Sequence, residues 1–189
     1  MKKYILLLVL AIFMPRCNFE TPTQFSNAAN ATVLTALGGE KATLKEVLSN
    51  YKGRKVLIDI WASWCADCIK GMPTITRLQR EFPEVVFLFL SVDKKNSAWK
   101  RGIQRFQMRG EHYNIPTGMR NGAFVDFVNL SWIPRYMVID ETGAISLFKA
   151  TNSSDKSILA ALKEVQYIVI VTISFSPAFF LFHFLILHF

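Results

Sequence analysis

Residues 56–68 read Val-Leu-Ile-Asp-Ile-Trp-Ala-Ser-Trp-Cys-Ala-Asp-Cys and end in two cysteines separated by two residues. The part up to Trp61 is apolar almost throughout, which predicts a central β-strand buried on both faces. From Cys65 to Phe82 the apolar residues recur at intervals of three and four, which predicts a helix. The two cysteines therefore open a helix that directly follows a buried strand.

A Cys-x-x-Cys pair at the start of a helix has a specific chemical use. The unpaired N–H groups and the positive potential of a helix N-terminus stabilise a thiolate, and the spacing lets the two sulfur atoms meet in a small ring. We expect Cys65 to be the exposed nucleophile and Cys68, one turn further along the helix, to resolve the mixed disulfide. The alternatives are half of a zinc site or two inert buried thiols, in a chain that has only three cysteines.

Other regular elements are predicted on both sides of this segment. Residues 84–90 form a second apolar run, which should lie beside the first strand through a βαβ crossover. Residues 110–131 have no clear pattern. The remaining predicted elements are a hairpin over 32–43, a helix over 44–50 capped by Thr43, a helix over 98–108, a hairpin of strands 135–140 and 144–149, and a closing helix over 155–165 capped by Ser153 or Ser154.

The two ends of the chain are more apolar than its middle. Residues 1–17 combine two lysines with a run of apolar residues, which fits a signal peptide. Cys17 is a candidate lipidation site of the bacterial lipoprotein type, and ordinary cleavage nearby or an uncleaved leader are alternatives. Residues 18–30 are polar and predict a linker. Residues 167–189 lack Asp, Glu, Lys and Arg, which favours a transmembrane segment over a dispensable extension or a packed core segment.

The net charge of +8 is concentrated in one stretch. Residues 94–120 contain seven Lys or Arg residues and a single acidic residue, Glu111. The simplest interpretation is a solvated face, although such a patch can also attract nucleic acid, acidic proteins or anionic headgroups. No nucleic-acid-binding motif accompanies the stretch, so we expect no nucleic-acid partner.

Residues 56–68 resemble the active-site strand and turn of the thioredoxin superfamily. Asp59 lies six residues before the first cysteine, where that family carries a buried acid. Pro73 lies five residues after the second cysteine, where the family kinks its active-site helix. The Ile133-Pro134 pair, just before a predicted strand, is similar to the cis-proline loop that faces the disulfide in the family.

The resemblance covers residues 31–166 and implies a particular architecture. We expect an α/β domain with a thioredoxin-like central mixed sheet flanked by helices. The N-terminal β-hairpin and an insertion before the cis-proline strand would be additions to the basic fold. Within this domain, the family would use no cofactor other than the redox-active disulfide, and no metal.

The resemblance also implies residue roles. Asp59, buried and therefore raised in pKa, would accept or relay the proton of Cys68. Trp64 would flank and shield the site together with Trp61. Pro134 in the cis form would expose the backbone of Ile133 for strand-like pairing with the substrate. A hydrogen-bonded core aspartate, ordinary aromatic packing and a trans proline are the corresponding alternatives.

The leader and the long segment before Pro134 are similar to the extracytoplasmic, membrane-attached branch, which includes the reductases of cytochrome c maturation. The resemblance implies reduction of protein disulfides in the periplasm or cell envelope of a bacterium. It also implies a membrane or periplasmic electron donor, and attachment to the membrane through an N-terminal lipid or the C-terminal tail. Alternatives on the same fold are a thiol oxidase, an isomerase, a copper metallochaperone or a peroxidase. Asp67 departs from the family, which carries proline there, and this affects the redox potential more than the reaction.

Overall fold

A computed structural model describes residues 21–164 of the chain. The predicted signal peptide with Cys17 and the apolar segment 167–189 lie outside these residues. Within residues 21–164, no helix combines the length and the apolar character that crossing a bilayer requires.

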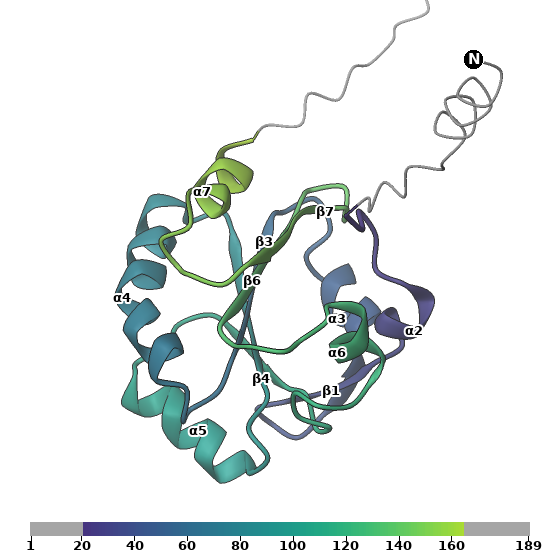
Figure 1. The fold of residues 1–189 in the computed structure, drawn as a ribbon, viewed down its shortest axis with the longest axis vertical. Helices are drawn as coiled ribbons and strands as arrows, with labels where there is room; N and C mark the ends of the chain where they lie inside the picture. The colour runs from purple at the N-terminus through teal and green to yellow at the C-terminus, as the bar shows by residue number, and fades with distance from the viewer. Residues whose placement is uncertain (1–20, 165–189) are drawn as a thin grey trace, which may run out of the picture.

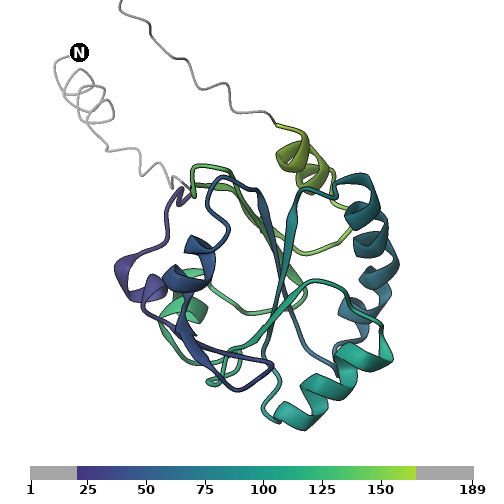
Figure 2. The same ribbon diagram turned by 180° about the vertical axis from the view of Figure 1, so that it is seen from behind.

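The core is a seven-stranded mixed sheet with the strand order β2-β1-β5-β4-β3-β6-β7. Its strands are β1 (Val33–Ala36), β2 (Lys41–Thr43), β3 (Val56–Trp61), β4 (Val86–Ser91), β5 (Glu111–Asn114), β6 (Arg135–Ile139) and β7 (Ile145–Ala150). The helices are α2 (Asn27–Asn30), α3 (Leu44–Ser49), α4 (Ala66–Glu81), α5 (Asn96–Arg105), α6 (Ala123–Phe127) and α7 (Lys156–Lys163). Helices α4, α5 and α7 lie on one side of the sheet, and α2, α3 and α6 lie on the other (Figures 1 and 2). The predicted α/β class is confirmed.

Strands β3 and β4 form the centre of the sheet. Every residue of both strands is buried, as their continuous apolar character predicts. They pair in parallel from Val56↔Val86 to Trp61↔Ser91, with α4 as the crossover between them. On its other side β3 pairs with β6 in the antiparallel sense. The carboxyl end of β3, where the cysteine motif begins, is therefore held by strands on both sides.

The N-terminal hairpin extends the sheet at one edge. Strands β1 and β2 pair antiparallel, and β1 joins the rest of the sheet through β5, with Thr35 opposite Asn114. Strand β5 and helix α6 come from residues 110–131, which lack a clear pattern in the sequence. Strand β5 has the polar sequence Glu-His-Tyr-Asn, yet His112 and Asn114 are buried. Its strand character comes from pairing on both sides rather than from an apolar alternation.

Two local expectations are wrong. Residues 21–30 are not simply a linker, because α2 belongs to the domain and the ring of Phe25 packs 5.5 Å from that of Phe127. The N-cap of α7 is Asp155 rather than Ser153 or Ser154, since the Asp155 side chain accepts a hydrogen bond from the Ser157 backbone N–H. The first error arises because contacts such as Phe25–Phe127 tie a locally polar segment to the domain, and the second because three adjacent residues are all possible caps.

Candidate active site

The Cys65–Cys68 disulfide lies at the N-terminus of α4. Cys65 is the N-cap residue of this helix, and its sulfur accepts a hydrogen bond from the Cys68 backbone N–H at 3.1 Å. The S–S distance is 2.06 Å. Both residues are buried in the disulfide form, Cys65 at 6% and Cys68 at 1% exposure, so the expected exposed nucleophile is only the less deeply buried of the two. The helix N-terminus, with the Cys68 N–H directed at the Cys65 sulfur, favours a thiolate at that position.

The loop before β6 faces this disulfide. The Ile133–Pro134 peptide bond is cis, and the carbonyl oxygen of Ile133 lies 3.6 Å from Cys65 Sγ. The side chains of Ile133 and Pro134 are buried. The resemblance placed these two residues opposite the cysteines, and the structure brings them together there.

Arg135, the residue after the cis-proline, has a position that sequence reasoning missed. Its side chain is 1% exposed, and its guanidinium donates to the carbonyl oxygen of Val128 at 2.6 Å and that of Asn129 at 3.4 Å. These carbonyls follow helix α6. Arg135 therefore ties the end of α6 to the start of β6, and so to the loop that faces Cys65.

The turn between β3 and the cysteines is held by a second buried group. The Asp93 carboxylate accepts hydrogen bonds from the backbone N–H and the hydroxyl of Ser63, each at 2.8 Å, and from the Ser91 hydroxyl at 2.9 Å. The Asn114 side chain donates to the backbone carbonyls of Ser91 and Asp93. This network connects the ends of β4 and β5 to the turn before Cys65. The sequence contained no signal for it, since Ser63 and Asp93 are thirty residues apart.

Asp59 lies in the middle of β3 and is buried. Burial raises the pKa of its carboxyl group to about 8, and within the described residues its Oδ1 atom has no hydrogen-bond partner. Asp59 pairs directly with Tyr136 of β6, so both side chains lie on the same face of the sheet. A Cβ atom on Gly71 of α4 would lie 2.9 Å from the Tyr136 hydroxyl oxygen. The face that carries Asp59 is therefore the one covered by α4, the helix of Cys68.

The two tryptophans of the motif have different environments. Trp61 is fully buried, and the tip of its ring approaches Gly102 of α5, so it is a core residue. Trp64 is 61% exposed beside Cys65. Trp132, which sequence reasoning missed, is 60% exposed two residues before Pro134. The expectation that Trp61 and Trp64 both flank the site holds only for the solvent-facing Trp64.

The arrangement is suited to thiol–disulfide exchange. It offers one sulfur at a helix N-terminus, a second sulfur in the same ring, and a buried carboxyl group whose pKa is close to that of a thiol. Across residues 21–164, no three His, Cys, Asp or Glu side chains gather closely enough to hold a metal ion.

Comparison with known proteins places this site in a family. Residues 53–145 match a family described as thioredoxin-like. The chain is 25% identical over 129 residues to the thiol-disulfide oxidoreductase ResA of Bacillus cereus. This match covers 67% of this chain and 69% of ResA. The chain belongs to the thioredoxin superfamily.

One further sequence relative and one solved structure show how far the similarity extends. The thioredoxin-like protein YneN of Bacillus subtilis is 29% identical over 119 residues, which is 59% of this chain, and the chain spans only 63% of the length of YneN. A thiol-disulfide oxidoreductase structure from Bacteroides fragilis superimposes with a TM-score of 0.59 at 21% identity, covering 72% of this chain and 99% of that one. The similarity to the Bacteroides fragilis structure shows a shared fold alone.

Proposed function

We propose that this protein is a thiol–disulfide oxidoreductase that reduces protein disulfides outside the cytoplasm. The observation that carries the proposal is the Cys65–Cys68 disulfide at the N-terminus of α4, with Cys65 Sγ 3.6 Å from the Ile133 carbonyl oxygen. The similarity to ResA, which is named a thiol-disulfide oxidoreductase, supports the same chemistry.

The reaction proceeds in two exchanges. In the reduced protein the Cys65 thiolate attacks a substrate disulfide, so that a Cys65–substrate disulfide forms and one substrate thiolate leaves. The Cys68 thiolate then attacks the Cys65 sulfur, which releases the second substrate thiolate and closes the Cys65–Cys68 disulfide. The substrate gains two electrons and the protein loses two. A membrane or periplasmic dithiol donor returns them.

Three groups assist these exchanges. Asp59 in its ionised form accepts the proton of Cys68 before the second exchange. The backbone of Ile133, beside the cis-proline, pairs with an extended substrate segment in the manner of an added strand. Trp64 provides an exposed aromatic surface next to the reacting sulfur.

The charge of Asp67 favours the reducing direction. This carboxylate belongs to the first turn of α4, the helix that Cys65 caps. Its negative charge disfavours a thiolate at Cys65 and so destabilises the reduced protein, which makes the protein a stronger reductant. Lys70 is 3.5 Å from Asp67 and offsets part of this effect.

The proposed location is the periplasmic side of a bacterial membrane. The basic and apolar N-terminus, with Cys17 as a lipid attachment site, supports secretion and anchoring. The apolar segment 167–189 is a second candidate anchor. Labelling of cells with a fatty-acid analogue tests the first mode, because a Cys17→Ser protein should lose the label.

Alkylation and trapping experiments test the proposed chemistry. At a limiting concentration of alkylating reagent, the reduced protein should be labelled first at Cys65, and preferential labelling of Cys68 would overturn the assignment. Cys65→Ser should abolish disulfide reduction. Cys68→Ser should accumulate mixed disulfides on Cys65 in cells. A redox titration against glutathione tests the direction, because the reduction potential of a reductase should be about −270 mV and that of an oxidase about −120 mV.

A further inference from the structure

Two exposed tryptophans are chain neighbours of the two residues that meet at the reacting sulfur. Trp64 directly precedes Cys65, and Trp132 directly precedes Ile133, whose carbonyl oxygen faces that sulfur. They are the most exposed large apolar side chains in the described part of the chain. Exposed aromatic side chains at a reactive centre are typical of surfaces that bind another protein, because their burial supplies much of the binding free energy.

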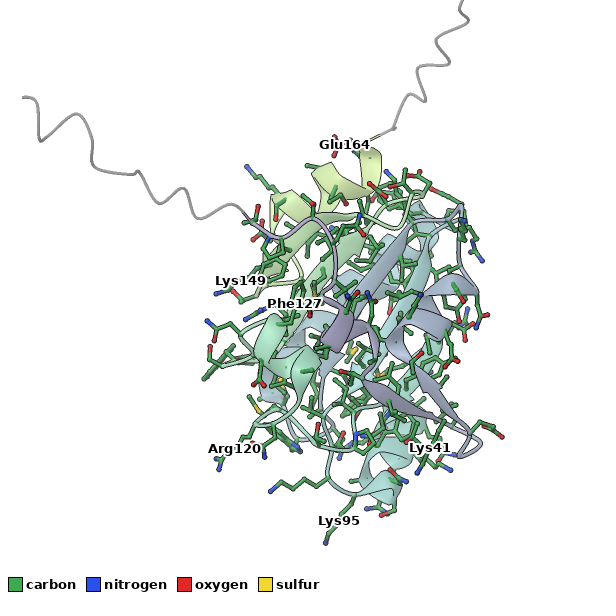
Figure 3. The ribbon with its side chains drawn as sticks, turned by 90° about the vertical axis from the view of Figure 1, so that its right-hand side faces the viewer. Lys41, Lys95, Arg120, Phe127, Lys149 and Glu164 are labelled. Atoms are coloured by element: carbon green, nitrogen blue, oxygen red, sulfur yellow. A yellow bond between two sulfur atoms is a disulfide. The ribbon has the colours of Figure 1, made fainter. Side chains whose placement is uncertain are left out.

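Trp64 lines a groove of about 510 Å³. Its other walls come from the residues after β4, including Val92, and from segment 117–121, including Met119. Three exposed basic side chains also line it, namely those of Lys94, Lys95 and Arg120. Figure 3 shows Lys95 and Arg120 at the same end of the domain, with both side chains directed outward. We call this feature, with its three basic residues, the Trp64 groove.

The charge of the Trp64 groove is positive. Asp93 is the one acidic residue among those lining it, and its carboxylate is buried and accepts hydrogen bonds from Ser63 and Ser91. Within residues 21–164, none of the three basic side chains belongs to a salt bridge. The groove therefore combines unpaired positive charge with apolar lining residues, and Trp64, the residue before Cys65, connects it to the disulfide.

We propose that the Trp64 groove selects protein substrates in which the reactive cysteine lies in an extended acidic segment that also carries an apolar residue. The apolar residue would pack on Trp64 or Trp132, and neighbouring Asp or Glu side chains would pair with the three basic residues. The argument is charge complementarity at a site whose chemistry requires a sulfur. A nucleic acid has no disulfide to offer Cys65, which favours an acidic protein as the occupant. This inference rests on the proposed function and adds the substrate class.

The test compares two peptides that differ only in charge. Each contains one internal disulfide, a leucine beside it, and flanking residues that are all Glu in one peptide and all Gln in the other. The pre-reduced full-length protein is mixed with an excess of each peptide, and the second-order rate constant for peptide reduction is measured. We expect the Glu peptide to react roughly tenfold faster at low ionic strength, and the ratio to fall toward one in about 0.5 M salt.

Reversing the charge of basic groove residues tests whether the groove causes the difference between the rates of the two peptides. In Lys94→Glu/Arg120→Glu the Glu-to-Gln rate ratio should fall to about one or below. The control Lys149→Glu/Lys156→Glu changes the net charge by the same amount at exposed positions that do not line the groove, and it should keep the ratio of the unmodified protein. Trp132→Ala should slow the reaction of both peptides several-fold while leaving the ratio intact.

The outcomes separate the two proposals. If the unmodified protein reduces neither peptide, the proposed function fails and the inference fails with it. If it reduces both at the same rate, or if the two charge-reversal variants lower the ratio equally, the oxidoreductase function stands and the acidic-substrate inference is overturned. Tight binding of single-stranded DNA that is lost in Lys94→Glu/Arg120→Glu would also overturn it, because the groove would then be a nucleic-acid surface.

Discussion

Asp59 and Tyr136 face each other across β3 and β6, on the side of the sheet covered by the helix that carries the cysteines. Burial raises the pKa of both side chains, and the negative charge of Asp59 contributes to the shift at Tyr136. This part of the interior is thus unfavourable to negative charge, and the carboxyl group of Asp59 stays protonated up to about pH 8.

Asp59 should make the folded state less stable as the pH rises. Its pKa is about 8 in the folded protein against a usual value of 3.8, so between these values the folded state binds more protons than the unfolded state and stability falls with pH. Asp59→Asn should therefore stabilise the oxidised protein by up to about 6 kcal/mol at pH 9, and the gain should disappear below about pH 4. Urea denaturation across this range measures the difference, and a gain independent of pH would contradict the buried-acid assignment.

The same residue should control release of the mixed disulfide. Asp59 accepts the Cys68 proton only when ionised, so the release rate should rise as the pH passes through about 8. In Asp59→Asn this rise should be lost and release should slow by roughly tenfold to a hundredfold. The measurement is the rate at which a Cys65 mixed disulfide with a small thiol resolves. Asp126→Asn, an exposed aspartate, is the matched control and should retain the profile of the unmodified protein.

Asp93 should be essential to the turn that presents Cys65. Asp93→Ala leaves the Ser63 N–H group and two hydroxyl groups without their acceptor, which should reduce the free energy of unfolding by about 3 kcal/mol. Asp93→Asn keeps one acceptor oxygen and should cost less. Asp126→Ala removes an exposed carboxylate and should change stability by no more than about 0.5 kcal/mol. Equal effects of Asp93→Ala and Asp126→Ala in urea denaturation would refute this role.

Asp67 should set the redox potential through its charge. A single charge at an exposed helix N-terminus is worth about 0.3–1 kcal/mol, which corresponds to about 6–20 mV for two electrons. Asp67→Asn should therefore lower the pKa of Cys65 and make the potential more oxidising by this amount. Asp67→Pro should shift it in the same direction, up to about 30 mV. If Asp67→Pro shifts the potential but Asp67→Asn does not, backbone geometry rather than charge sets its value.

The local pattern of residues 56–82 was sufficient to predict the strand, the helix and the cysteines at their junction. This is possible because burial on both faces produces a continuous apolar run, and a helix produces its own spacing of apolar residues. The Ile133-Pro134 loop was predicted from its resemblance to a family motif, and the structure places it opposite Cys65.

Only the tertiary structure decided which distant residues meet at the site. Strand β5 is polar in sequence and becomes a strand because β1 and β4 pair with it on either side. Asp93 reaches Ser63, and the groove beside Trp64 receives Arg120, because the sheet order brings the ends of separate strands together. Periodicity records which face of an element is buried, whereas these contacts depend on strand order and register, which no local stretch of sequence contains.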